Sequence, residues 1–336
     1  MKRIAITLSL LCAAAVCALA GKPTVKFNDG SLKILQLTDI HLKYEQSDQY
    51  RKSASRINHV IETEHPDLIL ITGDVVTGNK ETRDKMWDLV ISTLDSYKIP
   101  YAIVFGNHDD QGDITRPGMS AKIVAGKYNL NTLDSSGELA DIRIEVAPSK
   151  GGKGKSALDI YMMDSRTYAK LEGYDNAGTY AWFRHEQVEW LRHECEASTA
   201  ANGGVHVPSL AFFHIPLVEY NVAWNLPGVH IGVKGENGGE AKINSGMFAA
   251  MYETGNVMGV FAGHDHDDNY IVCHYGIALG YGGFSGDDTV YNHLAHGLRV
   301  IEVKEGCREF STWIHDEDDR IQFNALYKDG ELNKGN

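Results

Sequence analysis

The sequence predicts an α/β fold on three observations. In the first 110 residues, apolar strand-like runs alternate with segments of helical periodicity. The same alternation returns between residues 157 and 262. Strands and helices that alternate in this way form mainly parallel sheets with helical crossovers. Short runs at 270–280, 298–304 and 309–314 are expected to be antiparallel strands that close a second sheet.

Three strands in the first half each end in a short polar cluster. Residues 32–37, 67–72 and 101–105 are apolar runs of strand type, and apolar residues recur at helical spacing in 50–64 and 81–97. Ligands of open α/β sheets bind at the carboxyl ends of the strands. The polar clusters therefore stand where such a fold places its site.

The second half repeats this order of elements. Strands are expected at 157–163, 209–213 and 257–262, with helices at 184–197 and 243–252. The chain has no Pro/Ser-rich linker and no internal repeat. Residues 21–336 are therefore expected to form a single domain.

The composition excludes several classes of protein. Of 336 residues, 43% are hydrophobic and 23% charged, which is typical of a globular chain rather than a disordered or collagenous one. The 45 acidic residues outnumber the 32 basic ones, for a formal charge of −13. Broad binding to nucleic acid or anionic membranes requires a basic face, so neither partner is expected. The sequence does not predict an oligomeric state.

The first 20 residues resemble a secretory signal peptide. Lys2 and Arg3 precede a mainly apolar run at 4–16, and Ala18 and Ala20 are the small residues of a cleavage site after Ala20. The alternatives are a membrane anchor, for which the run is too short, and a lipoprotein. We therefore expect a secreted or periplasmic protein with no stable membrane span.

Three cysteines remain after cleavage: Cys195, Cys273 and Cys307. An odd number allows at most one disulfide. If one disulfide forms, we expect it to join Cys273 and Cys307.

Five polar clusters follow five of the expected strands. They are DIH at 39–41, GD at 73–74, GNHD at 106–109, His214 in FFHIP, and GHDH at 263–266. Each cluster alone is typical of a turn, a cap or a hydrogen-bonded histidine. The ordered set of five indicates a metal site, and its mixture of imidazole, carboxylate and amide oxygen suits Fe, Zn²⁺ or Mn²⁺ rather than Ca²⁺.

The ordered set resembles the calcineurin-like metallophosphoesterase superfamily, whose pattern is D-x-H, G-D, G-N-H-[D/E], H and G-H-x-H. The strings HIPLVEY, GHDHDDNY and GYGGF are similar to those of the purple-acid-phosphatase-related group. The resemblance implies two stacked mixed β-sheets flanked by helices, a four-layer α/β/β/α sandwich.

The same resemblance implies a centre of two divalent or trivalent transition-metal ions. Asp74 matches the bridging ligand. The first ion is then held by Asp39, His41 and His266, and the second by Asn107, His214 and His264.

His108 and Asp109 match the catalytic positions. In the family the histidine faces the leaving-group oxygen, where an imidazolium can donate a proton, and Asp109 is expected to orient it. The sequence departs from true purple acid phosphatases, which have glycine at the position of His41 and a metal-binding tyrosine at that of Thr77. A purple ferric–tyrosinate centre is therefore not expected.

The resemblance implies hydrolysis of a small phosphate monoester by a metal-bridging hydroxide. Phosphodiester hydrolysis, of cyclic nucleotides, nucleic acids or phospholipid head groups, is the alternative. A non-catalytic secreted binding protein is a third, and it predicts lost ligands, whereas every ligand position is filled.

Residues 217–243 are glycine-rich and irregular, which predicts a long functional loop. We expect Glu219, Tyr220 and Trp224 in this loop to decide the substrate. His230, which lies in the same loop, could also contact the substrate.

Overall fold

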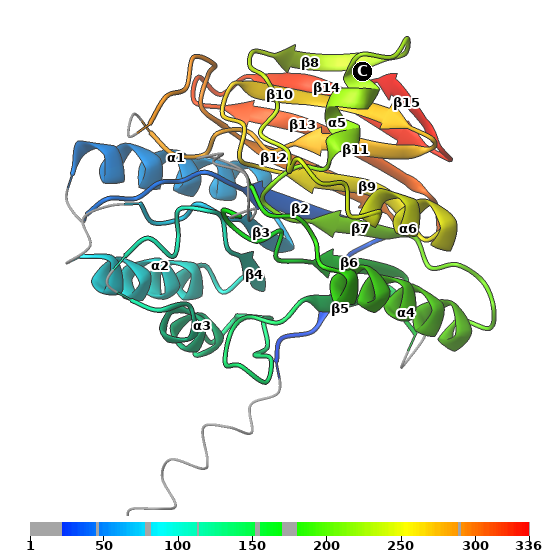
Figure 1. The fold of residues 1–336 in the computed structure, drawn as a ribbon, viewed down its shortest axis with the longest axis horizontal. Helices are drawn as coiled ribbons and strands as arrows, with labels where there is room; N and C mark the ends of the chain where they lie inside the picture. Colours follow the sequence, from blue (N-terminus) through cyan, green and yellow to red (C-terminus); the bar gives the residue numbers. More distant parts are fainter. Residues whose placement is uncertain are drawn as a thin grey trace, which may run out of the picture.

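Two mixed β-sheets lie face to face in the computed structural model, which describes residues 22–44, 47–77, 82–112, 114–151, 155–169, 180–287 and 290–335 (Figure 1). The expected α/β class with two mixed sheets is confirmed. The seven-stranded sheet has the order β15-β14-β13-β12-β2-β3-β4, and the eight-stranded sheet has the order β1-β5-β6-β7-β9-β11-β10-β8. The bounds are β1 Val25–Lys26, β2 Ser31–Leu37, β3 Leu68–Thr72, β4 Tyr101–Val104, β5 Ile142–Ala147, β6 Leu158–Met162, β7 Ser209–Phe212, β8 His230–Lys234, β9 Val257–Ala262, β10 Asp268–His274, β11 Ile277–Tyr281, β12 Gly297–Lys304, β13 Glu309–Asp316, β14 Ile321–Lys328 and β15 Glu331–Lys334.

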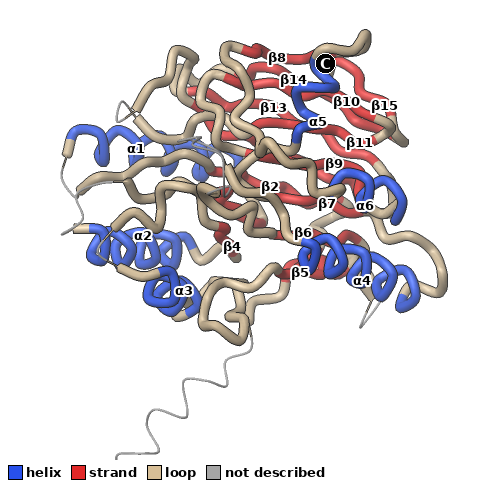
Figure 2. The backbone as a smooth tube through the Cα atoms, viewed as in Figure 1, coloured by secondary structure: helices blue, strands red, loops and turns tan. Residues whose placement is uncertain are grey.

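Helices cover the outer face of each sheet (Figure 2). One apolar cluster joins α1, α2 and α3 to the seven-stranded sheet, and another joins α4, α5 and α6 to the eight-stranded sheet. The four layers implied by the family resemblance are therefore present. The bounds are α1 Asp48–Glu64, α2 Arg83–Tyr97, α3 Arg116–Val124, α4 His185–Ala201, α5 Val218–Trp224 and α6 Met247–Thr254.

The largest core lies between the two sheets. Successive side chains of a strand point to opposite faces. Accordingly Leu32 and Ile34 of β2 join the cluster between the sheets, whereas Leu35 and Leu37 join the cluster under the helices. Both faces of β2 are apolar because both are covered, and this explains its nearly continuous hydrophobic run.

Helix α1 illustrates how the sequence sets the ends of an element. The side chain of Ser47 accepts a hydrogen bond from Tyr50 N, which caps the first turn. Ile57, Val60 and Ile61 then form its buried face. The helix ends at Glu64, and the next residue, His65, has a left-handed φ of 49°.

The expected grouping of the later strands is wrong. The run at 270–280 divides into β10 and β11, and these strands join the sheet that contains β7 and β9. Strands β12 and β13 instead extend the sheet of β2, β3 and β4, because β12 pairs antiparallel with β2. Without β12, that edge of β2 would leave backbone groups unpaired in the core.

Several elements were not expected from the sequence. They include the short helix α3, strand β5 and the hairpin of β14 and β15, and α4 runs four residues beyond its expected end. The expected irregular loop at 217–243 also contains α5 and β8. Tyr220 and Trp224 of α5 pack in or against the core under the eight-stranded sheet, so the predicted substrate role of these two side chains is wrong.

The three described cysteines are free. Cys273 lies in β10 of the eight-stranded sheet, whereas Cys307 lies between β12 and β13 of the other sheet. A disulfide between them is therefore contradicted. The predicted signal peptide at 1–20 lies outside the described residues.

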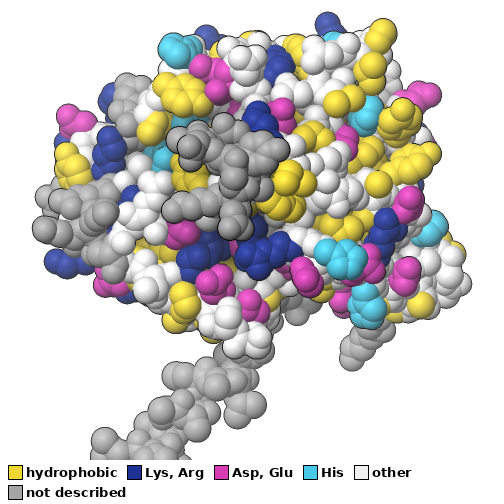
Figure 3. All heavy atoms as spheres, in the orientation of Figure 1, with side chains coloured by type: hydrophobic (Ala, Val, Ile, Leu, Met, Phe, Trp, Pro, Cys, Tyr) yellow, Lys and Arg dark blue, Asp and Glu magenta, His cyan; other side chains and the backbone are white. Residues whose placement is uncertain are grey.

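Among the described residues, no helix combines the length and the hydrophobicity of a membrane span. On the face shown in Figure 3, acidic and basic side chains are interspersed.

Candidate metal centre

The predicted clusters meet where strands of both sheets end. Backbone hydrogen bonds join them: Asp39 N donates to Gly73 O at 3.1 Å, and Gly263 N donates to His214 O at 3.0 Å. A third bond links the two sheets, because His264 N donates to Asp39 Oδ2 at 2.9 Å. The loops that follow β2, β3, β7 and β9 are therefore linked by hydrogen bonds. All seven predicted ligands are buried at this junction.

The first group of three ligands contains Asp39, His41 and His266, all buried. Nε2 of His41 and Nε2 of His266 are 3.2 Å apart. Both face Oδ1 of Asp39, at 3.8 and 3.5 Å. This is the trio that the family resemblance assigns to the first ion.

The second group contains Asp74, His214 and His264, also buried. Nε2 of His214 lies 3.3 Å from Oδ2 of Asp74 and 3.3 Å from Nδ1 of His264. It also lies 3.0 Å from Oδ1 of Asn107. Four predicted ligand atoms thus converge within a few ångströms.

Asp74 stands between the two groups. Its Oδ2 is 3.3 Å from Nε2 of His214 and 3.7 Å from Nε2 of His41. Its other oxygen, Oδ1, accepts from His108 N at 2.8 Å, which fixes the orientation of the carboxylate. This is the position that a bridging ligand requires.

Hydrogen bonds behind the ligands aim their nitrogen atoms at the centre. Nδ1 of His214 donates to Thr72 O at 2.8 Å, and Nδ1 of His266 donates to Tyr291 O at 2.8 Å. Nδ1 of His41 contacts Oγ1 of Thr77. In all three, Nε2 is left to face the ligand groups, which is the usual arrangement around a protein metal ion.

Thr77 occupies the position where a true purple acid phosphatase would have its metal-binding tyrosine. The hydroxyl here contacts the ring of His41 instead. Position 77 therefore supports a histidine ligand.

Asn107 is oriented in the same way. Its Nδ2 donates to the hydroxyl of Tyr168 at 2.9 Å. The amide oxygen is therefore the atom that faces His214.

Burial and the local charges set the protonation of the ligands. Burial lowers the pKa of His41 to about 4 and that of His264 to about 3, so both imidazoles are neutral near pH 7. Burial opposes a charge on His214 too, but the adjacent Asp74 carboxylate raises the pKa of His214 to about 10. Binding of a metal ion would displace that proton.

The carboxylates are ionised despite their burial. Burial alone would raise the pKa of Asp39, but the nearby imidazoles of His266 and His214 hold it well below the usual range. Burial also opposes ionisation of Asp74, and the charge of His214 lowers its pKa in the same way. Both residues are therefore anionic ligands.

The loops reach this geometry through an unusual backbone. Asp39, His41, Asp74 and His264 have φ values of 53°, 48°, 51° and 80°, in the left-handed region. Such conformations cost about 1–3 kcal/mol each and cluster at functional sites. Gly106 also serves the site, because a Cβ on it would clash with Oδ1 of Asp74.

His108 lies at the opening of the centre and is half-buried. Its ring centroid is 5.6 Å from that of His41 and 6.3 Å from that of Tyr168. Its Nδ1 is 3.0 Å from Oε1 of Gln111. Gln111, which lies outside the five predicted clusters, is the side chain that orients the ring.

The predicted contact of Asp109 with His108 is wrong. Asp109 is buried, and its Oδ1 accepts from the N–H groups of Val75 and Val76, while Oδ2 accepts from those of Asp74 and Gly106. Four amides already use both oxygens. Asp109 therefore fixes the two loops that carry Asp74 and His108, and it acts on the backbone.

The donor set fits a pair of transition-metal ions. Oδ1 of Asp39 is buried without a hydrogen-bond partner among the described residues. The two Nε2 atoms that face it belong to rings whose Nδ1 is already engaged. Lone pairs that converge without intervening donors are what a cation satisfies. The mixed nitrogen and oxygen ligands favour Zn²⁺, Fe or Mn²⁺ over Ca²⁺.

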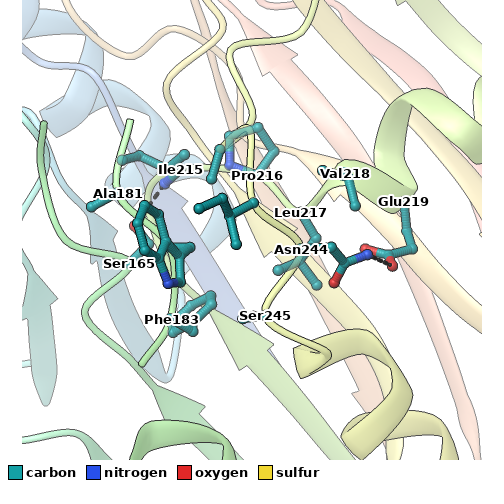
Figure 4. Close-up of a pocket in the computed structure, with 13 residues that line it drawn as sticks. Ser165, Ala181, Phe183, Ile215, Pro216, Leu217, Val218, Glu219, Asn244 and Ser245 are labelled. Atoms are coloured by element: carbon teal, nitrogen blue, oxygen red, sulfur yellow. Dashed lines mark hydrogen bonds between the residues drawn. The ribbon is translucent and has the colours of Figure 1, made fainter. Parts of the chain in front are cut away.

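The segment after His214 lines a separate small pocket (Figure 4). Ile215 N donates to Oγ of Ser165 at 2.8 Å, and Asn244 donates to Glu219 at 2.9 Å. Glu219 lines this pocket, and none of the described lining residues is a predicted metal ligand.

The part of the predicted loop at 217–243 that contains Gly239 reaches the metal centre. Gly239 N donates to Oδ1 of Asp265 at 2.8 Å, and a Cβ at Gly239 would clash with the ring of His264. His230 instead stacks on Trp224, with ring centroids 4.9 Å apart.

The chain belongs to the calcineurin-like phosphoesterase family, whose family model matches residues 32–268. The resemblance drawn from the five polar clusters is therefore confirmed. Fold and site together define a member of the metallophosphoesterases with two groups of metal-binding residues.

Particular relatives refine the comparison. "Probable inactive purple acid phosphatase 14" of Arabidopsis thaliana is 30% identical over 334 residues, which cover 87% of this chain and 80% of the relative. Phosphatase DCR2 of Saccharomyces cerevisiae is 27% identical over 321 residues, covering 85% and 54%. A dimetal phosphatase from Danio rerio shares the fold, with a TM-score of 0.59 at 12% identity over 89% of this chain and 99% of that one. The curated relatives support the purple-acid-phosphatase-related grouping.

Proposed function

We propose that the protein is a secreted phosphatase with two metal ions that hydrolyses phosphate monoesters of small molecules. One observation carries the proposal: two buried trios of ligands meet at Asp74, whose Oδ2 faces a histidine of each. All seven predicted ligand positions contain a side chain able to bind a metal. A relative bears the word inactive in its name, so activity of this chain is the point to test.

Two bound metal ions would polarise the phosphoryl oxygens and activate a water molecule. The residues of the chain provide the rest. Asp39 and Asp74 supply negative charge that holds the ions, and Thr77 orients His41. The metal ions are Fe, Zn²⁺ or Mn²⁺ in this proposal.

His108 is the proposed general acid. Gln111 contacts its Nδ1, so Nε2 is the nitrogen available to a substrate at the half-buried opening. From there an imidazolium can donate its proton to the oxygen of the departing alcohol. That proton transfer matters most when the leaving group is a poor one.

A cavity of about 430 Å³ supports a small anionic substrate. Tyr168, which binds the amide of Asn107, is one of its walls, so the cavity adjoins the metal centre. Arg116, Arg166 and Arg184 also line it. Arg116 is paired with Glu138 and Asp164, Arg166 also lies 3.8 Å from Asp164, and Arg184 adds a third guanidinium group.

The test is reconstitution of the metal-stripped protein. The chain is loaded with Mn²⁺, Zn²⁺ or Fe²⁺, and metal per chain is measured beside hydrolysis of nitrophenyl phosphate and bis-nitrophenyl phosphate. We expect two ions per chain and faster hydrolysis of the monoester. Preference for the diester would replace monoesterase by phosphodiesterase, and two bound ions without turnover of either ester would make the protein a binding protein.

Secretion is a separate part of the proposal, supported by the charged and apolar pattern of residues 1–20. N-terminal sequencing of the protein recovered outside the cytoplasm is expected to begin at Gly21. Retention of Met1 in protein found only in the cytoplasm would contradict it.

A further inference from the structure

A second cluster of metal-binding side chains involves none of the seven ligands described above. It contains His59 on α1, His315 on β13 and Asp319 in the turn that follows β13. Oδ1 of Asp319 lies 3.1 Å from Nε2 of His59 and 2.7 Å from Nε2 of His315. Two imidazole nitrogens therefore face one carboxylate oxygen.

His315 is buried, and carboxylates lie against both of its ring nitrogens. Its Nδ1 is 2.9 Å from Oε1 of Glu64, and its Nε2 faces Asp319. Glu64 also accepts from Trp313 Nε1 at 2.9 Å and from Lys33 Nζ at 3.2 Å. Glu64 is an acceptor in this network, so Nδ1 of His315 carries a proton and Nε2 is the nitrogen that faces the cluster.

We propose that His59, His315 and Asp319 form a third metal site, which binds a divalent transition ion of the Zn²⁺ class. Two nitrogens and one carboxylate oxygen are ligands that such ions prefer to those of Ca²⁺ or Mg²⁺. Ligand bonds of about 2.0–2.1 Å in a tetrahedral shell separate neighbouring ligand atoms by roughly 3.3 Å. The observed separations of 3.1 and 2.7 Å are shorter than that value, so the ligand atoms would spread by about 0.2 to 0.6 Å around an ion.

The surroundings also fit a metal ligand. A carboxylate that accepts the second N–H of a ligating histidine is a common support of zinc sites, and Glu64 holds that position behind His315. The side chains of His59 and Asp319 are 55% and 63% exposed, so an ion can enter from solvent. Three protein ligands leave a coordination position for water.

The site joins elements that are distant in sequence. His59 belongs to a helix of the outer layer, whereas His315 and Asp319 belong to the end of β13 and its turn. An ion bound by all three would fasten α1 to the end of β13 in the seven-stranded sheet. Its contribution is therefore to stability, and the ligands of the catalytic centre are left unchanged.

The competing explanation is a network of ion pairs with a protonated His315 between Glu64 and Asp319. Equilibrium dialysis against Zn²⁺, followed by elemental analysis, separates the two. We compare the full chain with His59→Ala and Asp319→Asn, both exposed changes that leave buried His315 in place. His193→Ala removes an exposed histidine of α4 and is the matched control.

We expect His59→Ala and Asp319→Asn each to bind one zinc ion fewer per chain than the unaltered protein and the His193→Ala control. Zinc should also raise the melting temperature less in these two variants than in the control. Equal zinc content and equal thermal shifts in all four proteins would overturn the proposal and leave only the ion-pair network. The comparison counts a difference between chains, so it does not depend on phosphatase activity.

Discussion

Two buried carboxylates in the loops of the metal centre have opposite surroundings. Asp109 accepts hydrogen bonds from four backbone N–H groups. Asp39 has one oxygen with no hydrogen-bond partner in the described part of the chain, and that oxygen faces two imidazole nitrogens. The first carboxylate is satisfied by the protein, and the second is left for a cation.

This difference distinguishes a buried carboxylate that stabilises the fold from one that binds a metal ion. A carboxylate whose lone pairs are filled by amides stabilises the fold, because its burial is compensated by hydrogen bonds. A carboxylate that faces other potential ligands binds a metal ion. Asp74 combines the two, because Oδ1 accepts from His108 N while Oδ2 faces the histidines.

The largest effect is expected from Asp74→Asn, which removes the charge shared by both groups of ligands. We expect kcat/KM to fall about 10³-fold, equivalent to about 4 kcal/mol, and metal content to fall below two ions per chain. Asp84→Asn, an exposed change on α2, should leave both unchanged. An Asp74→Asn protein with two ions and full activity would show that the metal centre is assigned wrongly.

Asp109→Asn tests the other side of the comparison. An amide cannot accept from all four N–H groups, and its own NH₂ would face two of them. We expect the free energy of unfolding, measured with urea, to fall by about 3 kcal/mol.

Asp110→Asn is the neighbouring control. Its carboxylate is partly exposed and pairs with Arg116 at 3.6 Å, so we expect a loss below about 1 kcal/mol. If Asp109→Asn were as stable as this control but turned over slowly, Asp109 would act on the chemistry and the contrast with Asp39 would fail.

His108→Asn should separate chemistry from metal binding. We expect kcat to fall about 10²-fold through loss of the general acid, with two ions still bound. The loss should be greater for an alkyl phosphate than for nitrophenyl phosphate, whose leaving group hardly needs a proton. Loss of metal, or equal losses for both esters, would count against this role.

The sequence predicted the centre better than it predicted the sheets. Each polar cluster directly follows a strand, and parallel strands bring their carboxyl ends together, so local order was enough to find Asp39, Asp74 and His214. The pairing of β12 with β2 joins residues more than 260 positions apart. No local pattern indicates that β12 pairs with β2. The sequence therefore predicts one sheet for β10, β11, β12 and β13, whereas the structure divides them between two.

The sequence does not predict which side chains orient His41, Asn107 and His108, and the reason is related. Thr77, Gln111 and Tyr168 act through single hydrogen bonds that only the folded loops create. The family resemblance and the usual support of a histidine by a carboxylate predict that Asp109 orients His108. In the structure, the side chain of Asp109 accepts from the N–H groups of the loop that follows β3. The sequence pattern does not show which backbone N–H groups a side chain will reach.

The smallest effect is expected from Thr77→Val, which keeps the shape of the side chain and removes the hydroxyl that contacts His41. Without this contact, Nδ1 of His41 loses its partner and the ring loses its fixed direction. Affinity for one metal ion should fall about 10-fold, as is usual when such a support is lost. Competition with a chromophoric chelator measures it, and Thr77→Ser, which keeps the hydroxyl, should bind nearly as the unaltered protein. Equal weakening by valine and serine would mean that packing, and not the hydrogen bond, positions His41. The contrast between carboxylates filled by the backbone and ligands aimed at a metal would then lose its support at this residue.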